Sequence, residues 1–255
     1  GGSGMRRLGG RRLLPGDNRA KGKWGRKMKD QYFGDKRDLF KFDLVLDIMA
    51  ATGLRKFCYL PMQTEPDVSG HGGLVPRAAN GRRPELFDFL VAERARGEPR
   101  LSRLRRFFEL CPEVRYLPYR DSLDAGEYTH GQREAYFADV PDDLLRDSCV
   151  LLDPDIGLER GRADPTKYLH FDSLLGLRSR CRNAVVVVYQ HLQKNAHLRL
   201  AQVGGDMARL RTCLAPALVS CIRDGDQAFY TIAQDAGLGR SAADALFCHA
   251  EKTGR

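Results

Sequence analysis

The feature that most constrains the fold is an uninterrupted apolar run, "NAVVVVYQHL", at residues 183–192. Consecutive valines are typical of a β-strand, because side chains branched at Cβ fit the pleated backbone better than a helix. A strand that lacks alternating polar residues has no face suited to water, so both of its faces must be covered. The run therefore predicts a mostly parallel sheet that lies between two layers of helices.

The rest of the chain alternates between helical and strand patterns. Spacing of apolar residues by three or four predicts helices at 35–53, 84–97, 101–111, 171–180, 197–214 and 241–254, the last with Ser241 as its N-cap. Short apolar runs predict strands at 56–61, 113–118 and 149–153, and two more within 217–235 that are joined by a turn around Gly225. This order predicts an α/β fold: one Rossmann-like three-layer sandwich over residues 30–255, with an antiparallel hairpin near its C-terminus.

Positive charge is concentrated before this domain. Residues 1–4, Gly-Gly-Ser-Gly, are typical of a cleavage scar, and residues 1–29 contain ten lysines and arginines but only one acid, Asp17. The remaining residues carry equal numbers of acidic and basic side chains, so the whole net charge of +9 belongs to this segment. A glycine-rich basic arm over residues 5–29 predicts a disordered segment that binds the phosphate backbone of a nucleic acid. A solubilising tail and a contact with anionic lipid are the alternatives.

Other composition features predict a cytoplasmic protein. No apolar run reaches the roughly 20 residues that span a bilayer, and the N-terminus lacks the apolar region of a signal peptide. The seven cysteines are scattered without a Cys-x-x-Cys pair, and the six histidines lack the spacing of metal ligands. We therefore expect reduced thiols, no metal and no membrane contact, and the oligomeric state stays open.

Polar side chains follow two of the predicted strands. "CVLLDPDIGLERG" (149–161) delivers Asp153 and Asp155 to a turn, and the valine run ends in Tyr189, Gln190 and His191. In doubly wound sheets, ligands bind beyond the carboxyl ends of strands, and sequential parallel strands often adjoin. These five residues are therefore expected to surround one site, although Asp-Pro is also ordinary turn chemistry.

A second cluster, "QYFGDKRDLFK" (31–41), joins the arm to the first helix. Asp35 is a candidate N-cap, and Asp38 suits the positive end of the helix dipole. The same stretch can bind nucleic acid, because Tyr32 can stack on a base and Lys41 can hold a phosphate. Phe33 is expected to be buried.

Basic side chains outside these clusters are candidate contacts to the nucleic-acid backbone. They are Arg11, Arg12, Lys21, Lys23, Arg26, Lys27 and Lys29 in the arm, and Arg82 and Arg83 in the predicted loop 62–83.

Two resemblances to known families rest on these motifs. "YFGDKRDLFKFDLVLDIM" resembles the opening motif of bacterial 23S rRNA adenine-N6 methyltransferases, and "LLDPDIG" lies where their Asp-Pro-Pro-Tyr occurs. The late hairpin also suits the class I methyltransferase sheet. This resemblance implies S-adenosylmethionine as cofactor. However, Asp-Pro-Asp-Ile lacks the aromatic that stacks on the target base, and "QTEPDVSGHGG" replaces the usual acidic Gly-x-Gly loop.

The combination of Tyr-Phe-Gly-Asp-x-x-Asp-x-x-Lys, Asp-Pro-Asp-x-Gly and Val-Tyr-Gln-His resembles bacterial phage-defence proteins more closely. These include DNA glycosylases that act on α-glucosylated hydroxymethylcytosine. Uracil-DNA glycosylases offer an analogy of chemistry, because Asp-Pro begins their catalytic turn too.

The glycosylase resemblance implies hydrolysis of the bond between a modified cytosine and its sugar in phage DNA, without a cofactor. Asp153 or Asp155 would stabilise the sugar cation or activate water. Tyr189, Gln190, His191 and Tyr32 would hold the flipped base, while Asp35 and Lys41 would complete the site. A Schiff-base role for Lys41, a methyltransferase and a non-catalytic nucleic-acid-binding module stay open as alternatives.

Overall fold

The strands form a mixed sheet in the order β2-β1-β3-β6-β8-β7. The computed structural model describes residues 1, 33–62, 64, 75–97, 100–119, 133–160 and 167–254. The six strands are β1 (Lys56–Met62), β2 (Arg115–Pro118), β3 (Ser148–Pro154), β6 (Val185–His191), β7 (Leu218–Asp224) and β8 (Gln227–Ala233). The first four strands in the sheet order run parallel, and β8 runs antiparallel to both of its neighbours. The predicted α/β sandwich with an antiparallel C-terminal hairpin is confirmed.

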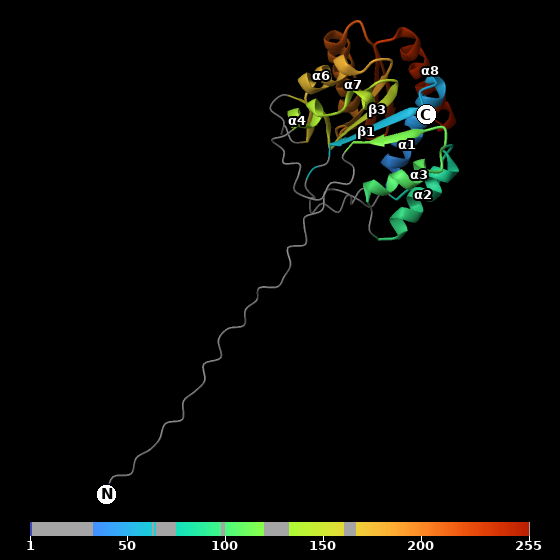
Figure 1. The fold of residues 1–255 in the computed structure, drawn as a ribbon, viewed down its shortest axis with the longest axis vertical. Coiled ribbons are helices and arrows are strands. Elements are labelled where there is room, and N and C mark those ends of the chain that lie inside the picture. Colours follow the sequence, from blue (N-terminus) through green and yellow to red (C-terminus); the bar gives the residue numbers. More distant parts are fainter. Residues whose placement is uncertain are drawn as a thin grey trace.

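Helices cover both sides of this sheet (Figure 1). They are α1 (Lys36–Thr52), α2 (Pro84–Ala95), the 3₁₀ turn η3 (Leu101–Arg103), α3 (Leu104–Phe108), α4 (Arg133–Ala138), α5 (Asp142–Leu145), α6 (Phe171–Arg180), α7 (Ala196–Leu214) and α8 (Ala236–Lys252). Two short strands, β4 (Gly157–Leu158) and β5 (Tyr168–Leu169), pair separately from the main sheet.

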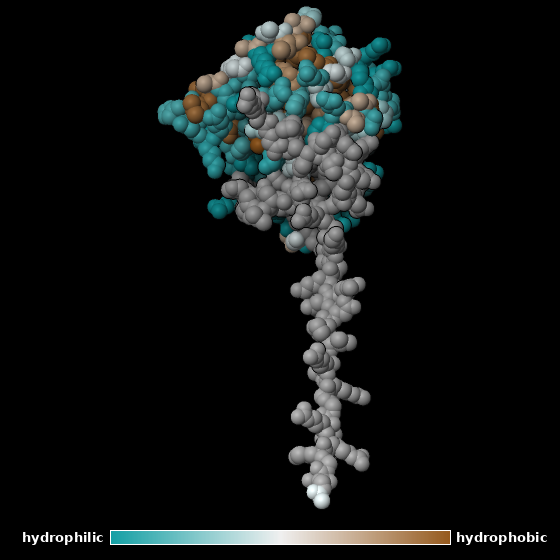
Figure 2. All heavy atoms as spheres, turned by 90° about the vertical axis from the view of Figure 1, so that its left-hand side faces the viewer, coloured by the Kyte–Doolittle hydropathy of each residue, from teal (hydrophilic) through white to brown (hydrophobic). Residues whose placement is uncertain are grey.

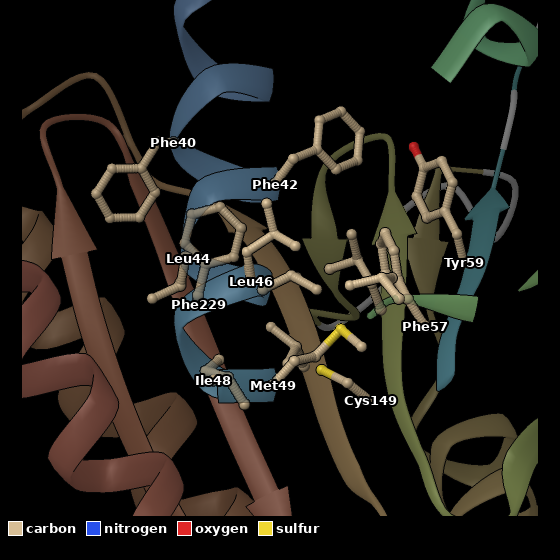
Figure 3. Close-up of a cluster of buried hydrophobic side chains, with 14 of the residues drawn as sticks. Phe40, Phe42, Leu44, Leu46, Ile48, Met49, Phe57, Tyr59, Cys149 and Phe229 are labelled. Atoms are coloured by element: carbon tan, nitrogen blue, oxygen red, sulfur yellow. The ribbon is translucent and has the colours of Figure 1, made fainter. Parts of the chain in front are cut away.

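The strands divide their side chains between two cores. Phe57 and Tyr59 of β1 belong to a cluster that packs against α1, α2, α3 and α8, whereas Cys58 and Leu60 belong to a second cluster with α4, α5, α6 and α7. This alternation follows from the two-residue period of a β-strand. Figure 3 shows the first core, with side chains of α1 directed at Phe229 and at the β1 residues. Both faces are covered, as the valine run predicted.

Helix α1 is buried on all sides near its start. Residues 38–46 are all buried, because the helix lies against β3 and also contacts α2 and α8. This stretch includes three charged residues, Asp38, Lys41 and Asp43. A buried charge is costly unless it is paired, so each of these side chains requires a partner of opposite charge.

The prediction that the acidic turn adjoins the valine strand is also confirmed. Strand β3 pairs with β6 in parallel, with Leu151 opposite Val187 and Leu152 opposite Val188. The carboxyl ends of β1, β3 and β6 therefore meet at one edge of the sheet, and we call this the carboxyl edge.

The last helix begins earlier than the sequence predicted. Asp235 caps α8 by accepting a hydrogen bond from the Leu238 backbone N–H at 2.8 Å, so the predicted Ser241 cap is wrong. Ser241 lies inside the helix, because the glycines at 237 and 239 do not end the hydrogen-bonded backbone. Gly239 is instead required by packing, since an added Cβ would lie 2.7 Å from Leu218 Cδ1.

No helix among the described residues is long and apolar enough to cross a membrane. Hydrophilic side chains predominate among the coloured residues of the face in Figure 2.

Candidate functional site

The centre of the site is the ammonium group of Lys41, which lies between two carboxylates. Its Nζ atom is 2.9 Å from Asp38 Oδ1 on the same helix and 2.7 Å from Asp153 Oδ2 at the end of β3. Asp38 and Lys41 lie three residues apart on α1, so they share one side of the helix. The structure thus brings Lys41 of the second cluster against Asp153 of the acidic turn, 112 positions away in the sequence.

The start of α1 is fixed by three further hydrogen bonds. Asp35 is the N-cap, and its Oδ1 accepts the backbone N–H groups of Arg37 at 2.8 Å and Asp38 at 3.0 Å. Asp38 Oδ2 in turn accepts the Gly34 N–H at 2.9 Å. Gly34 has φ +83°, and an added Cβ would lie 3.0 Å from the Leu90 carbonyl oxygen, so a side chain is not tolerated there. Asp35 is therefore both a cap, as predicted, and a neighbour of the ion cluster.

Tyr59 is a site residue that sequence reasoning missed. Its hydroxyl donates to Asp153 Oδ2 at 2.6 Å, from the middle of β1. Asp153 Oδ2 therefore receives both this hydrogen bond and the Lys41 ion pair. The alternation of side chains along β1 could have identified it. Tyr59 lies two residues before Pro61, the predicted last residue of the strand, so both face the same side of the sheet.

The residues in these contacts carry a negative net charge. Asp38, Asp153 and Lys41 together carry one net negative charge, and ionised Asp35 adds a second. Burial and the nearby Asp38 carboxylate raise the pKa of Asp35 to about 6. Burial alone would lower the pKa of Lys41, but Asp153 and Asp38 outweigh it and leave the pKa above its ordinary value. A protonated amine has no lone pair to attack a sugar, which argues against the Schiff-base alternative.

Tyr189 closes one side of the cluster. Lys41 Nζ lies 5.3 Å from the centre of the Tyr189 ring, and the ring meets Phe229 edge to face. Burial raises the pKa of the Tyr189 phenol above its ordinary value, so the phenol stays neutral. Tyr189 is 7% exposed and lies in the site as predicted.

Gln190 is engaged with the backbone of the acidic turn. Its Oε1 accepts the Leu158 N–H at 2.8 Å, and its Nε2 donates to the carbonyl oxygens of Ile156 at 3.2 Å and His191 at 2.6 Å. The side chain is buried, so in this structure it supports the turn instead of presenting its amide to a base.

Asp155 and His191 occupy the more accessible part of the site. Both are partly exposed, and Thr64 Oγ1 donates to Asp155 Oδ2 at 3.3 Å. Burial and the nearby Arg37 guanidinium lower the pKa of His191, although Asp226 and Asp155 oppose them. His191 is therefore mainly a neutral hydrogen-bonding group at neutral pH.

Arg82 and Arg83 are the two backbone contacts predicted in the described part of loop 62–83, and both are paired with acids of the fold. Arg83 Nη1 binds Asp43 at 2.7 Å and Asp47 at 2.8 Å, and the buried Arg82 lies 3.6 Å from Asp224 and over the Phe40 ring. Both guanidinium groups neutralise acids of the fold, because burial would otherwise leave those acids unpaired. Tyr32 and the seven basic residues predicted in the arm lie outside the described residues: Arg11, Arg12, Lys21, Lys23, Arg26, Lys27 and Lys29.

One group in the described part of the chain has the composition of a metal site. Asp43, Asp47 and His249 offer ligand atoms within 4.8 Å of one another. Lys252 Nζ, however, already lies 2.9 Å from Asp43 Oδ2 and 2.6 Å from Asp47 Oδ2. With Arg83 bound to the same two acids, the group is an ion cluster that joins α1 to α8.

Comparisons of the chain with protein-family models, with curated proteins and with solved structures found no match.

Proposed function

We propose that the protein is a DNA glycosylase that hydrolyses the N-glycosidic bond of a modified cytosine. The observation that carries this proposal is the carboxylate of Asp153, which is held by Lys41 and Tyr59 inside a cluster of net negative charge. Breaking a glycosidic bond builds positive charge on the sugar. A carboxylate that is already oriented stabilises that charge without reorganising during the reaction.

The proposed step balances with water alone. The bond between C1′ and the base nitrogen breaks, its electron pair leaves with the base, and the water oxygen bonds to C1′. One water proton passes to Asp155, which then releases it to solvent, and the departing base takes up a proton from solvent. Asp155 suits the role of base because it is more exposed than Asp35 and Asp38 and is hydrogen-bonded to Thr64.

The identity of the base is proposed from the motifs. The resemblance to phage-defence glycosylases favours glucosylated hydroxymethylcytosine, in which case the protein acts in the cytoplasm on invading DNA. The target nucleotide has to leave the duplex, and Asp153, Asp155 and His191 are partly exposed groups that can meet it. Tyr189 lies behind them, and no cofactor takes part.

A methyltransferase is the second candidate, and one observation favours it. The antiparallel β8 lies between β6 and β7, which suits the class I methyltransferase sheet named above. The negative cluster would also suit the sulfonium of S-adenosylmethionine, because a sulfonium is a cation.

Mass spectrometry on three DNAs tests both candidates. Unmodified, hydroxymethylated and glucosyl-hydroxymethylated duplexes are incubated with the protein, with and without S-adenosylmethionine, and assayed for free base, abasic sites and added methyl groups. Release of a modified base without cofactor supports the glycosylase. Mass gain that depends on the cofactor identifies a methyltransferase. If neither appears on any DNA, the proposal fails and a non-catalytic binding module takes its place.

A further inference from the structure

Basic side chains gather beside the site at the carboxyl edge. Lys36 and Arg37 open α1, Lys194 lies in the loop after β6, and Arg199 lies in the first turns of α7. Lys36 and Lys194 are exposed, and the two arginines are partly exposed. From residue 191 to residue 205 the chain has no acidic residue. We call these four residues the basic rim.

Contacts to the β7–β8 turn hold the rim together. Arg37 forms an ion pair with Asp226. Arg199 donates from Nε to the Gln193 carbonyl at 2.9 Å, from Nη1 to the Gly225 carbonyl at 3.0 Å and from Nη2 to the Lys194 carbonyl at 3.1 Å. The four basic residues of the rim carry four positive charges, and Asp226 is the acid paired with one of them. The rim and Asp226 together therefore have a net charge of +3.

His191 connects the rim to the site. Its backbone N–H donates to the Ile156 carbonyl at 2.7 Å, which places it against the acidic turn. Arg37, Asp226, Asp155 and Arg199 all act electrostatically on its ring, so His191 lies within reach of both groups. The basic rim therefore lies beside the acidic turn, with His191 close to both.

We infer that the basic rim binds the phosphate backbone of a nucleic-acid strand on either side of the nucleotide in the site. A strand has the matching charges, because its phosphates are anionic on the outside while the sugar becomes cationic only at the reacting position. Lys36 and Lys194 contact phosphates directly, and Arg199 fixes the loop that carries Lys194. This inference rests on the proposed function and adds Lys36 and Lys194 to the phosphate contacts predicted in the arm and at Arg82 and Arg83.

Salt-dependent binding of the full chain to a fluorescein-labelled DNA duplex tests the inference. The double variant Lys36→Ala/Lys194→Ala is compared with the control Arg115→Ala/Arg182→Ala. Both control residues are exposed and lie away from the carboxyl edge, because Arg115 is the first residue of β2 and Arg182 precedes β6. Each lost phosphate contact reduces the slope of log K against log salt by about 1. We expect the first pair to reduce the slope by about 2 and the second pair to leave it unchanged.

An unchanged slope in the first variant, or an equal reduction in both variants, overturns the inference. If Lys36→Ala/Lys194→Ala loses binding to vesicles of anionic phospholipid but keeps its DNA binding, the inference is overturned and the rim binds a lipid surface instead. The thermal midpoint of each variant confirms that it is folded. DNA binding does not require turnover, so the two proposals can fail separately. If Lys36→Ala/Lys194→Ala reduces the salt slope but the parent releases no base from any DNA, the glycosylase proposal is wrong and the inference about the rim is supported.

Discussion

At the scale of single residues, the site is a set of charges that the fold holds at a cost. Asp35 is the clearest case, because burial and Asp38 raise its pKa to about 6 while its Oδ1 caps α1. A folded-state pKa above the unfolded value of 3.8 means that the folded chain binds the proton more tightly. Ionisation of Asp35 therefore destabilises the fold as the pH rises from about 4 to beyond 6.

Asp35→Asn removes this cost and keeps a good N-cap. We expect the variant to gain stability relative to the parent as the pH rises from 4 to 8, by up to about 3 kcal/mol. Urea unfolding at several pH values measures the difference in free energy. The exposed Asp244→Asn is the control and should give a constant difference. A constant difference for Asp35→Asn as well would show that burial does not perturb this carboxyl.

Tyr59 tests whether Asp153 has to be held in place. Tyr59→Phe removes one hydrogen bond to the carboxylate, and a bond to a charged group contributes roughly 1.5–3 kcal/mol. We expect base release to slow by about 10- to 100-fold while the protein stays folded. Tyr230→Phe is the matched control, because the Tyr230 hydroxyl donates to Asp206 at 2.8 Å on the other side of the sheet. Equal loss of turnover in both variants would assign Tyr59 a structural role only.

Sequence reasoning identified Lys41 and Asp153 of the site but not the Tyr59 hydroxyl that binds the Asp153 carboxylate. Asp153 and Tyr189 were predicted to lie together because both follow strand ends, and the glycosylase resemblance added Asp35 and Lys41 to the same site. Tyr59 was missed because an aromatic inside a strand is ordinary core, and only the three-dimensional register brings its hydroxyl to Asp153. For the same reason Arg83 could not be told from an exposed arginine, since its partner acids lie 36 and 40 positions away.

At the scale of elements, the acidic turn depends on a glycine. Gly157 in β4 has φ +136°, and an added Cβ would lie 2.3 Å from Gln190 Oε1. Few residues other than glycine adopt this conformation. Because the Gln190 amide binds the backbone on both sides of Gly157, any side chain there would displace the turn that carries Asp155.

Gly157→Ala should therefore destabilise the protein by about 2–3 kcal/mol and reduce turnover. Gly176→Ala in α6 is the control, because its added Cβ meets nothing within 4 Å. An alanine inside a helix is expected to stabilise by about 0.5–1 kcal/mol. Urea midpoints compare the two variants, and a Gly157→Ala protein as stable as the parent would show that the turn adapts without Gln190.

Long elements were predicted more accurately than short ones. The valine strand, α1 and the C-terminal hairpin have strong periodic patterns, and the structure confirms them. The predicted helix at 101–111 is a 3₁₀ turn followed by the shorter α3. Helices α4 and α5 and strands β4 and β5 were not predicted, because segments of two to six residues carry too little periodicity to stand out.

At the scale of the whole molecule, the sheet order explains why distant motifs form one site. The N-terminal helix α1 packs beside β3 near its start, and the parallel β1, β3 and β6 all end at the same edge. A strand that is apolar on both faces has to be covered on both sides, which requires three layers. The four consecutive valines therefore predicted the fold class. The position of the basic rim beside the negative cluster could not be predicted, because it depends on contacts of α1 and α7 with the β7–β8 turn.

We propose that the carboxylate of Asp153 drives the release of a base. The most direct measurement is the single-turnover rate of free-base release, by mass spectrometry, from glucosyl-hydroxymethylated DNA without cofactor. Asp153→Asn is compared with the parent and with the exposed Asp244→Asn. We predict that the parent and Asp244→Asn release the modified base at the same rate and that Asp153→Asn is slower by at least about 100-fold, since it removes a preorganised charge. Equal rates for folded Asp153→Asn and parent would contradict the claim.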